Sequence, residues 1–217
     1  MKNVHVERII PILRREVARF REPSVSTIAR EENPFQVLVS CILSLRTRDA
    51  VTSAASERLF RLANTPEKML ALPEKAIRKA IYPVSFYRVK ARNIQGACRI
   101  LLEKHGGKVP QTMEQLLELP GVGRKTANIV LVYGFRKEGL PIDTHCHRIP
   151  NRLGWIRTRT PEETEQVLRK QLPKKYWQDF NDIFVTFGQN VCLPVRPRCS
   201  SCAIARFCRR VGVERSR

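Results

Sequence analysis

The sequence predicts an all-α protein, because helix start signals and helix-spaced apolar residues recur along it and no stretch alternates convincingly like a strand. Three capping residues are each followed by proline, at Asn33-Pro34, Thr65-Pro66 and Thr160-Pro161, which is typical of a helix N-terminus. The chain has 217 residues and 42% hydrophobic content, so it can bury a core in one large or two small domains. We therefore expect about ten short helices joined by brief connections.

The expected helices can be followed along the chain by their apolar spacing, beginning with an amphipathic helix over residues 4–20. The residues that mark the successive helices are Ile9, Leu13, Val17 and Phe20; Phe35, Leu38, Val39 and Ile42; Val89, Ile94, Ala97, Leu101 and Leu102; and Phe180, Ile183, Phe184 and Phe187. The third set should end near Gly106-Gly107. No repeat or low-complexity linker is visible, so composition alone marks no domain boundary.

The charge balance points to a polyanionic partner. The chain carries 40 Lys and Arg against 20 Asp and Glu, a net charge of +20. Nucleic acid is the first candidate, while an anionic membrane, ribosomal RNA or mere solubility are alternatives. No run of about 18 apolar residues is present and the N-terminus does not resemble an export signal. We expect an intracellular protein of the cytoplasm or nucleoid without a membrane partner.

A helix-hairpin-helix is predicted at about 112–135. Residues 119–128 read Leu-Pro-Gly-Val-Gly-Arg-Lys-Thr-Ala-Asn, between a short helix over 112–118 and an apolar one. The two glycines allow a tight turn and bring a ligand close to bare backbone, and the second helix offers its unpaired N–H groups to phosphate. We expect DNA contacts from Gly121, Val122, Gly123 and Arg124. The hairpin alone leaves Lys125 as a solvated or phosphate-contacting lysine.

Downstream, the sequence places an acid and a His-Cys-His tripeptide together. Asp143 fits an N-cap for a helix that continues through Arg152. The side chains of His145, Cys146 and His147 would point about 100° apart along that helix, so we do not expect them to share one metal ion.

Four of the seven cysteines form a compact set, Cys192, Cys199, Cys202 and Cys208, with the spacing C-x6-C-x2-C-x5-C. In a reducing compartment such a set indicates metal ligation rather than disulfides. A single C-x2-C pair within so short a loop favours a [4Fe–4S] cluster, with zinc as the alternative. The remaining cysteines, Cys41, Cys98 and Cys146, are expected to be small buried apolar residues.

Arginines surround these cysteines, and they suggest a basic surface for phosphates. They are Arg196, Arg198, Arg206, Arg209 and Arg210. Of these, Arg196 and Arg198 are the predicted DNA contacts.

In their order along the chain, these motifs resemble the endonuclease III family of the helix-hairpin-helix, Gly-Pro-Asp superfamily of DNA glycosylases. The matching residues are Leu43-Ser44 with Thr47 and Asp49; residues 119–128; Ile142-Asp143-Thr144-His145 with Arg148, Asn151 and Arg152; and the four cysteines. The resemblance covers nearly the whole chain. It implies a six-helix barrel domain over 27–137 and an iron–sulfur cluster domain formed by 1–26 with 138–217, with DNA lying across the cleft between them.

The resemblance also implies a base-excision-repair enzyme, a DNA glycosylase with abasic-site (AP) lyase activity that removes oxidised pyrimidines. The Lys125 amine would attack C1′, expel the base and leave a Schiff base, and β-elimination of the 3′ phosphate would cut the strand. Asp143, facing Lys125 across the cleft, would assist as a carboxylate. The partner would be double-stranded DNA containing damaged bases or abasic sites, bound by a monomer that carries a [4Fe–4S] cluster.

Two residues depart from the family pattern. Phe86, in the loop 84–87, stands where leucine is often found and is either the wedge that fills the gap left by a flipped nucleotide or an ordinary core aromatic. Arg46 replaces a common glutamine, which leaves lesion and opposite-base preference open. His145 completes the predicted DNA contacts. The alternatives are a mismatch-directed thymine or adenine glycosylase and a non-catalytic iron–sulfur DNA-binding or redox protein.

Overall fold

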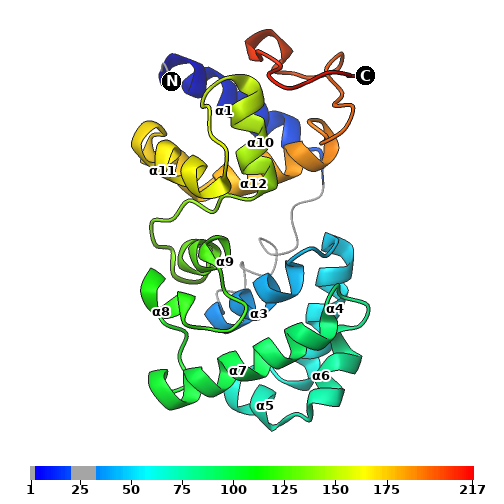
Figure 1. Cartoon of the computed structure of the whole chain (residues 1–217), viewed down its shortest axis with the longest axis vertical. Coiled ribbons are helices and arrows are strands. Elements are labelled where there is room, and N and C mark those ends of the chain that lie inside the picture. The colour runs from blue at the N-terminus through cyan, green and yellow to red at the C-terminus, as the bar shows by residue number, and fades with distance from the viewer. Residues whose placement is uncertain (1–2, 21–32) are drawn as a thin grey trace. The chain divides into compact units, whose positions relative to one another are not determined.

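The computed structural model describes residues 3–20 and 33–217, and within them every regular element is helical, which confirms the all-α prediction (Figure 1). The α-helices are α1 (Asn3–Val17), α3 (Pro34–Ser44), α4 (Asp49–Leu62), α5 (Pro66–Ala71), α6 (Glu74–Ile81), α7 (Tyr87–His105), α8 (Met113–Leu117), α9 (Arg124–Ile129), α10 (Thr144–Leu153), α11 (Pro161–Gln171) and α12 (Trp177–Asn190). Three single-turn elements accompany them: a π-helical turn, η1 (Val130–Gly134), and two 3₁₀ turns, η2 (Lys174–Tyr176) and η3 (Ala205–Phe207). None of the helices in this part of the chain combines the length and apolar character needed to cross a bilayer.

The three predicted helix starts are confirmed by their caps. The side chain of Asn33 accepts hydrogen bonds from the backbone N–H groups of Phe35 and Gln36, at 3.0 and 3.2 Å. The Thr65 and Thr160 hydroxyls accept in the same way from the backbone of Lys68 and Glu163. Each cap satisfies N–H groups that a helix leaves without an internal partner.

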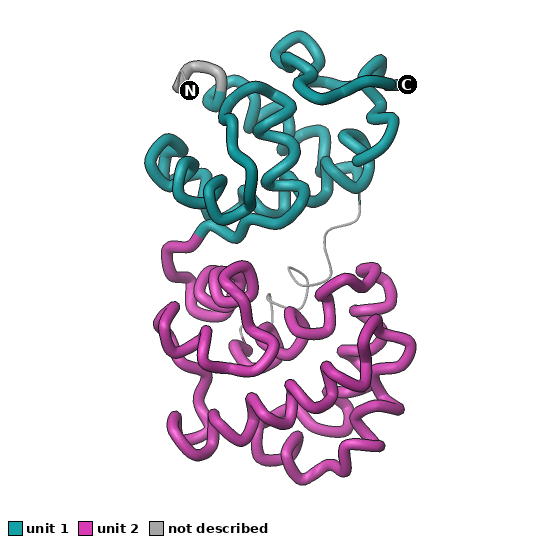
Figure 2. Tube along the Cα trace, in the orientation of Figure 1, with its two compact units in different colours: residues 1–23, 140–217 teal, residues 24–139 magenta. Residues whose placement is uncertain are grey.

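The chain divides into two compact units, Met1–Pro23 with Leu140–Arg217 and Ser24–Gly139 (Figure 2). Each has its own hydrophobic core. The predicted boundary between residues 26 and 27 lies outside the described residues, and the domain limits 27–137 stay a prediction.

In the unit Ser24–Gly139, α3 is the central helix, in contact with α4, α7, α9 and η1. Its residues Leu38, Val39, Cys41 and Ile42 are buried, as the apolar spacing predicted. Such a helix, apolar on more than one face, belongs inside a bundle.

The buried face of α7 differs from the prediction at its first turn. Val89 was expected on that face but is 45% exposed, whereas Lys90 is only 5% exposed. The stripe that packs inward runs through Lys90, Ala91, Ile94 and Ala97 at helical spacing. The assignment of Val89 was wrong because a lysine takes its place on the inner face.

The apolar helix after the hairpin changes its winding. Helix α9 ends at Ile129 and continues as a π-helical turn through Gly134. The hydrogen bond from the N–H of Lys137 to the carbonyl of Leu131 follows, at 2.9 Å. A period of 3.6 residues does not reveal such a widened turn.

In the other unit, α12 is central and contacts α1 and α10, while α11 packs on α10. The rings of Phe180 and Phe184 stack with centroids 4.2 Å apart in its core. On α1, Ile9 and Leu13 are buried as expected, and Val17 is partly buried against the same core. The helix ends at Val17 rather than at residue 20, and Phe20 is partly buried against this core from the turn that follows.

Candidate functional sites

The hairpin between α8 and α9 depends on Gly121. Its φ is +80°, and a Cβ there would lie 2.7 Å from the side-chain amide nitrogen of Asn93 on α7. Left-handed backbone and the close approach both require glycine. The N–H of Val122 closes the turn on the carbonyl of Leu119 at 3.1 Å.

Gly123, the residue before α9, is not required to be glycine by its backbone conformation or its neighbours. It is exposed, its φ of −102° suits any residue, and a Cβ would meet nothing within 4 Å. The fold tolerates a side chain at this position. The missing side chain therefore leaves the start of α9 open to a ligand that approaches the backbone closely.

Lys125 lies half-buried in the first turn of α9, with the exposed Arg124 before it. Burial raises the pKa of the Cys41 thiol to about 12, and the positive charge of Lys125 partly opposes this rise. The charge of Lys125 is therefore felt at the buried Cys41 of α3. Asn128, one turn later, donates to the carbonyl of Arg124 at 3.1 Å and so braces the helix start.

Asp143 is the N-cap of α10, as predicted. Its Oδ1 accepts hydrogen bonds from the backbone N–H groups of His145 and Cys146, each at 2.8 Å. These two bonds fix the carboxylate at the helix start. Asp143 belongs to the unit Met1–Pro23 with Leu140–Arg217, and Lys125 belongs to the unit Ser24–Gly139.

His145 is held within its unit rather than projecting alone. A Cβ on Gly188 would lie 2.2 Å from its Nδ1, so the ring packs directly on the bare backbone of α12. Arg148 Nη2 lies 3.0 Å from the same nitrogen and donates to the carbonyl of Cys192 at 2.9 Å. Cys146, with Cys41 and Cys98, is buried, as expected.

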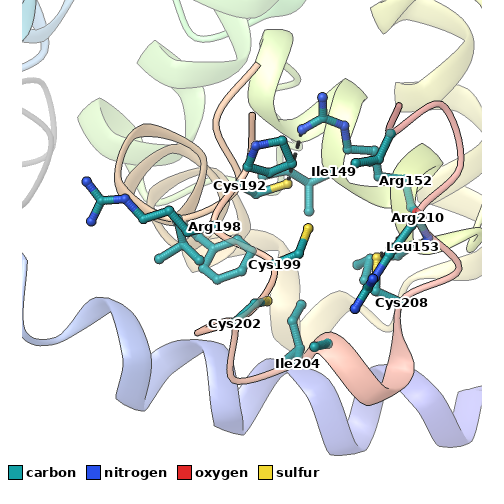
Figure 3. A pocket seen from close by; sticks show the side chains of 15 residues that line it. Ile149, Arg152, Leu153, Cys192, Arg198, Cys199, Cys202, Ile204, Cys208 and Arg210 are labelled. Atoms are coloured by element: carbon teal, nitrogen blue, oxygen red, sulfur yellow. Dashed lines mark hydrogen bonds between the residues drawn. The ribbon is translucent and has the colours of Figure 1, made fainter. Parts of the chain in front are cut away.

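The four predicted cysteines line a single pocket (Figure 3). It is otherwise largely apolar, with Ile149, Leu153, Phe187, Val191 and Ile204 on its walls. Arg152 extends over it and donates to Cys192 Sγ at 3.4 Å, the dashed line in Figure 3.

The backbone of this cysteine loop, residues 192–208, is tied to α10. The N–H of Arg210 donates to Cys208 Sγ at 3.4 Å, and the carbonyl of Arg152 accepts from the N–H of Val211 at 3.1 Å. Arg152 also donates to the carbonyls of Leu193 and Pro194, both at 2.7 Å. One arginine therefore joins the helix to both ends of the loop.

The four thiols together form a candidate ligand set for a metal centre. A single zinc ion needs its sulfur ligands at about 2.3 Å from one point. In the described part of the chain, no three His, Cys, Asp or Glu side chains are gathered closely enough for this. Four cysteine thiols that line one pocket are a ligand set for a [4Fe–4S] cluster, as they also are for zinc.

The pKa values of two of these thiols are raised, so that the thiolate form requires a positively charged partner. Burial, together with the neighbouring Cys192, Cys208 and Cys199, raises the pKa of Cys202 to about 11. The pKa of Cys208 is raised by burial and by the same neighbours. Thiolates here need a metal to offset both effects.

The two arginines predicted to contact DNA from this loop are both exposed. The side chain of Arg198 points away from the sulfurs (Figure 3). Arg196 has a φ of +51°. Both residues are therefore accessible to a ligand in solvent, and Arg198 also lines the cysteine pocket.

Arg46 and Phe86, which lie 40 positions apart in the sequence, meet on the surface of one unit. The guanidinium carbon of Arg46 is 6.0 Å from the ring centroid of Phe86. Phe86 is 62% exposed, so the reading of Phe86 as a core aromatic is wrong. Both residues have left-handed backbone, with φ of 54° and 57°.

Sequence reasoning missed the residue behind this pair, Lys90. It is buried on α7, and its ammonium donates to the carbonyls of Leu43 and Leu45 and to the hydroxyl of Thr47. A signal was present, since Lys90 lies one turn from Ile94 within the apolar stripe of α7.

The helical fold and the glycine hairpin are those of a helix-hairpin-helix DNA repair protein. Residues 39–174 match the model of the HhH-GPD superfamily of base excision DNA repair proteins. An endonuclease III from Thermotoga maritima is 49% identical to the chain over 179 residues, covering 82% of this chain and 84% of that protein. The chain belongs to the endonuclease III family.

Two solved structures share this fold at 37% identity and a TM-score of 0.78, covering 82% of this chain and 84% of theirs. One is a non-covalent endonuclease III–DNA complex, and the other is a trapped covalent endonuclease III–DNA intermediate with an estranged adenine.

Proposed function

We propose that the protein is a bifunctional DNA glycosylase and AP lyase that removes oxidised pyrimidines from duplex DNA. The observation that carries this proposal is Lys125, an amine in the first turn of α9 two residues after the exposed Gly123, where a Cβ would meet nothing within 4 Å. Membership of the endonuclease III family supports it, and so does the covalent DNA intermediate trapped for a relative. The net charge of +20 suits a phosphate backbone as ligand.

In the proposed reaction, the deprotonated Lys125 amine attacks C1′ of the damaged nucleotide while the C1′–N bond breaks and the base leaves with the bonding electrons. The sugar ring then opens to a Schiff base. Loss of a C2′ proton and departure of the 3′ phosphate cut the strand, and water hydrolyses the Schiff base to release the amine.

Asp143 is proposed as the assisting carboxylate. It stabilises the positive charge that develops on the sugar as the base leaves, or accepts a proton from the attacking amine. The hydrogen bonds from His145 and Cys146 that cap α10 both go to Oδ1. The cap therefore fixes the orientation of the carboxylate at the start of α10.

DNA binding is proposed at two surfaces. In the hairpin, phosphate approaches the backbone of Gly121, Val122 and Gly123 and the side chain of Arg124, which positions the duplex without reading sequence. Next to the cysteine pocket, Arg196, Arg198 and His145 supply further contacts.

Arg46 and Phe86 are proposed to fill the gap that the flipped nucleotide leaves. An exposed aromatic ring with a cation 6.0 Å from its centroid presents both an apolar wedge and hydrogen-bond donors. Phe86 would stack in the duplex, and Arg46 would contact the orphaned base.

The cysteine pocket is proposed to hold a [4Fe–4S] cluster through Cys192, Cys199, Cys202 and Cys208. Such a cluster supplies a rigid cross-link and the capacity for one-electron transfer. The protein's own contribution is to order the arginine-bearing loop against α10 through Arg152.

Borohydride trapping on a duplex with one abasic site tests the reaction. The native protein should be captured covalently, and Lys125→Ala should abolish capture while Lys104→Ala, an exposed lysine on α7, leaves it intact. Capture that survives Lys125→Ala would remove this lysine as nucleophile. No capture by the native protein would favour a non-catalytic DNA-binding protein.

The substrate class is tested by comparing excision from thymine glycol duplexes with excision from T·G and A·G mismatches. Faster excision of thymine glycol is expected. A preference for mismatches would assign the chain to the mismatch-directed glycosylases instead.

A further inference from the structure

The loop that carries Arg46 and the loop that carries Phe86 are each held in a costly conformation. Left-handed backbone at a residue other than glycine costs about 1–2 kcal/mol and persists only where the surroundings impose it. Arg46 and Phe86, with φ of 54° and 57°, are both exposed, so core packing of their own side chains does not impose it. Something beneath the two loops must fix them.

A buried ammonium lies beneath them. Lys90 Nζ donates to the carbonyl of Leu43 at 2.8 Å, to that of Leu45 at 2.5 Å and to the Thr47 hydroxyl at 3.2 Å. Leu45 and Thr47 are the residues on either side of Arg46. The ammonium therefore holds both flanks of the Arg46 turn at the C-terminal end of α3, where a cation also suits the helix dipole.

The same network reaches the second loop. The Thr47 hydroxyl oxygen accepts from the backbone N–H of Ser85 at 3.2 Å, and Ser85 directly precedes Phe86. The backbone N–H of Lys90 donates to the carbonyl of Phe86 at 3.0 Å. Lys90 thus contacts the Phe86 turn directly through its backbone, and its side chain contacts that turn through Thr47.

Burying a charged lysine here costs more free energy than filling the same space with an apolar side chain. Its three acceptors are two carbonyls and one hydroxyl, all neutral, and a buried cation without an opposite charge is costly. Burial lowers the pKa of Lys90 to about 8. An apolar residue would fill the same space at lower cost but would leave the three acceptors without this donor.

We propose that Lys90 is a positioning residue that, with Thr47, locks Arg46 and Phe86 into one geometry for entering the duplex. The inference rests on the proposed gap-filling role of that pair. In this inference the ammonium couples the two loops so that they act together. Removing its hydrogen bonds should therefore weaken nucleotide flipping more than DNA binding.

The test uses a duplex with a tetrahydrofuran abasic analogue, which cannot react with Lys125, opposite a 2-aminopurine. Native protein should change the 2-aminopurine emission on binding, because the side chains that enter the gap alter the stacking of the orphaned base. Lys90→Met keeps most of the side-chain volume without the ammonium, and Thr47→Val removes only the hydroxyl. Both should bind the duplex yet lose most of the emission change.

Excision provides a second measurement. Under single-turnover conditions with saturating protein, Thr47→Val should remove thymine glycol about tenfold more slowly, as expected for loss of one buried charge-assisted hydrogen bond. Lys90→Met, which loses all three bonds of the ammonium, should be slowed at least as much. Capture at a preformed abasic site, where little flipping energy is needed, should fall less. Thr47→Ser, which restores the hydroxyl, should restore emission and rate, and Lys104→Met is the matched control on α7.

The outcomes separate this inference from the proposed function. If Phe86→Ala keeps the full emission change, the gap-filling role fails and the inference fails with it. If Phe86→Ala loses the change while Lys90→Met and Thr47→Val keep it, only the role of Lys90 is overturned. Thr47→Val and Thr47→Ser carry the test if circular dichroism shows that Lys90→Met does not fold.

Discussion

Gly121 and Gly123 lie two residues apart in the hairpin, yet the structure uses their missing side chains differently. Gly121 is required by a φ of +80° and by the nearby Asn93, whereas a side chain at Gly123 would project into open space. Folding and ligand binding can therefore be tested separately within one turn.

Gly123→Ala should fold normally and bind duplex DNA more weakly, because the added methyl group stands where the proposed phosphate approaches the backbone. The free energy of unfolding should fall by no more than about 1 kcal/mol, the scale of an N-cap change. Gly121→Ala should instead destabilise the protein by about 1–2 kcal/mol from the left-handed backbone alone. Thermal unfolding and fluorescence anisotropy measure the two effects, and unchanged affinity of Gly123→Ala would argue against the hairpin contact.

At the scale of residues, the sequence predicted the side chains whose chemistry is local. Asn33, Thr65, Thr160 and Asp143 cap helices as expected because a cap involves only the next few residues. The exposure of Phe86 depends on a partner loop 40 positions away, and periodicity does not describe such a partner.

Among the helices, α7 matters for both stability and the proposed function, because its Lys90 is buried in the fold and contacts the Arg46 and Phe86 loops. The helix packs on α3, α5 and α6 and buries an amine among apolar neighbours. Folding therefore depends on the protonation state of that amine.

The stability of the native protein relative to Lys90→Met should rise between about pH 8 and pH 10.5. Burial lowers the pKa of Lys90 from 10.5 to about 8 in the folded state, so in this window the unfolded chain binds more protons. The free energy of unfolding of the native protein should gain about 1 kcal/mol or more over the variant. Urea unfolding of both proteins at pH 7.5 and pH 10 measures this, and parallel pH dependences would show that the pKa is not lowered.

The metal proposed for the cysteine loop should depend on each of its four cysteine ligands. Cys202→Ala should yield colourless protein without visible iron–sulfur absorption and with less iron, because one of four ligands is removed. Cys98→Ala, a buried cysteine in the other unit, should keep the colour. Metal analysis and absorption spectra decide the matter, and a colourless native protein containing zinc would overturn the cluster proposal.

Element starts were easier to predict than element interiors. Capping residues followed by proline mark a start chemically, whereas the π-helical turn η1 and the inward Lys90 arise from packing on α3. Lysine is a polar residue, and sequence hydrophobicity does not show the three oxygens that accept hydrogen bonds from its ammonium.

At the scale of the whole molecule, the net charge of +20 should make DNA binding strongly salt-dependent. Replacing Arg196 and Arg198 with glutamine should lower the slope of log affinity against log salt by about 2, close to one for each phosphate that is no longer neutralised. Replacing Lys170 and Lys174, which are exposed on and after α11, removes equal charge and should change the slope less. Equal effects would mean that the arginines act only through overall charge.

The division into two units was expected only through the family resemblance. Apolar spacing predicts helices one at a time and does not tell which distant helices share a core. The unit that contains α12 draws on both ends of the described chain, which no local pattern reveals.

The packing of α1 on α12 also constrains how the protein is made. Arg14 on α1 pairs with Asp179 on α12 at 2.7 Å, 165 positions later. During translation, which adds about 5–20 residues per second, α1 leaves the ribosome many seconds before its partner exists. The apolar side chains of Val6, Ile9, Ile10 and Leu13 therefore stay exposed to solvent until α12 has been synthesised, while Ser24–Gly139 folds. Newly made chains should therefore depend most on chaperones during that interval.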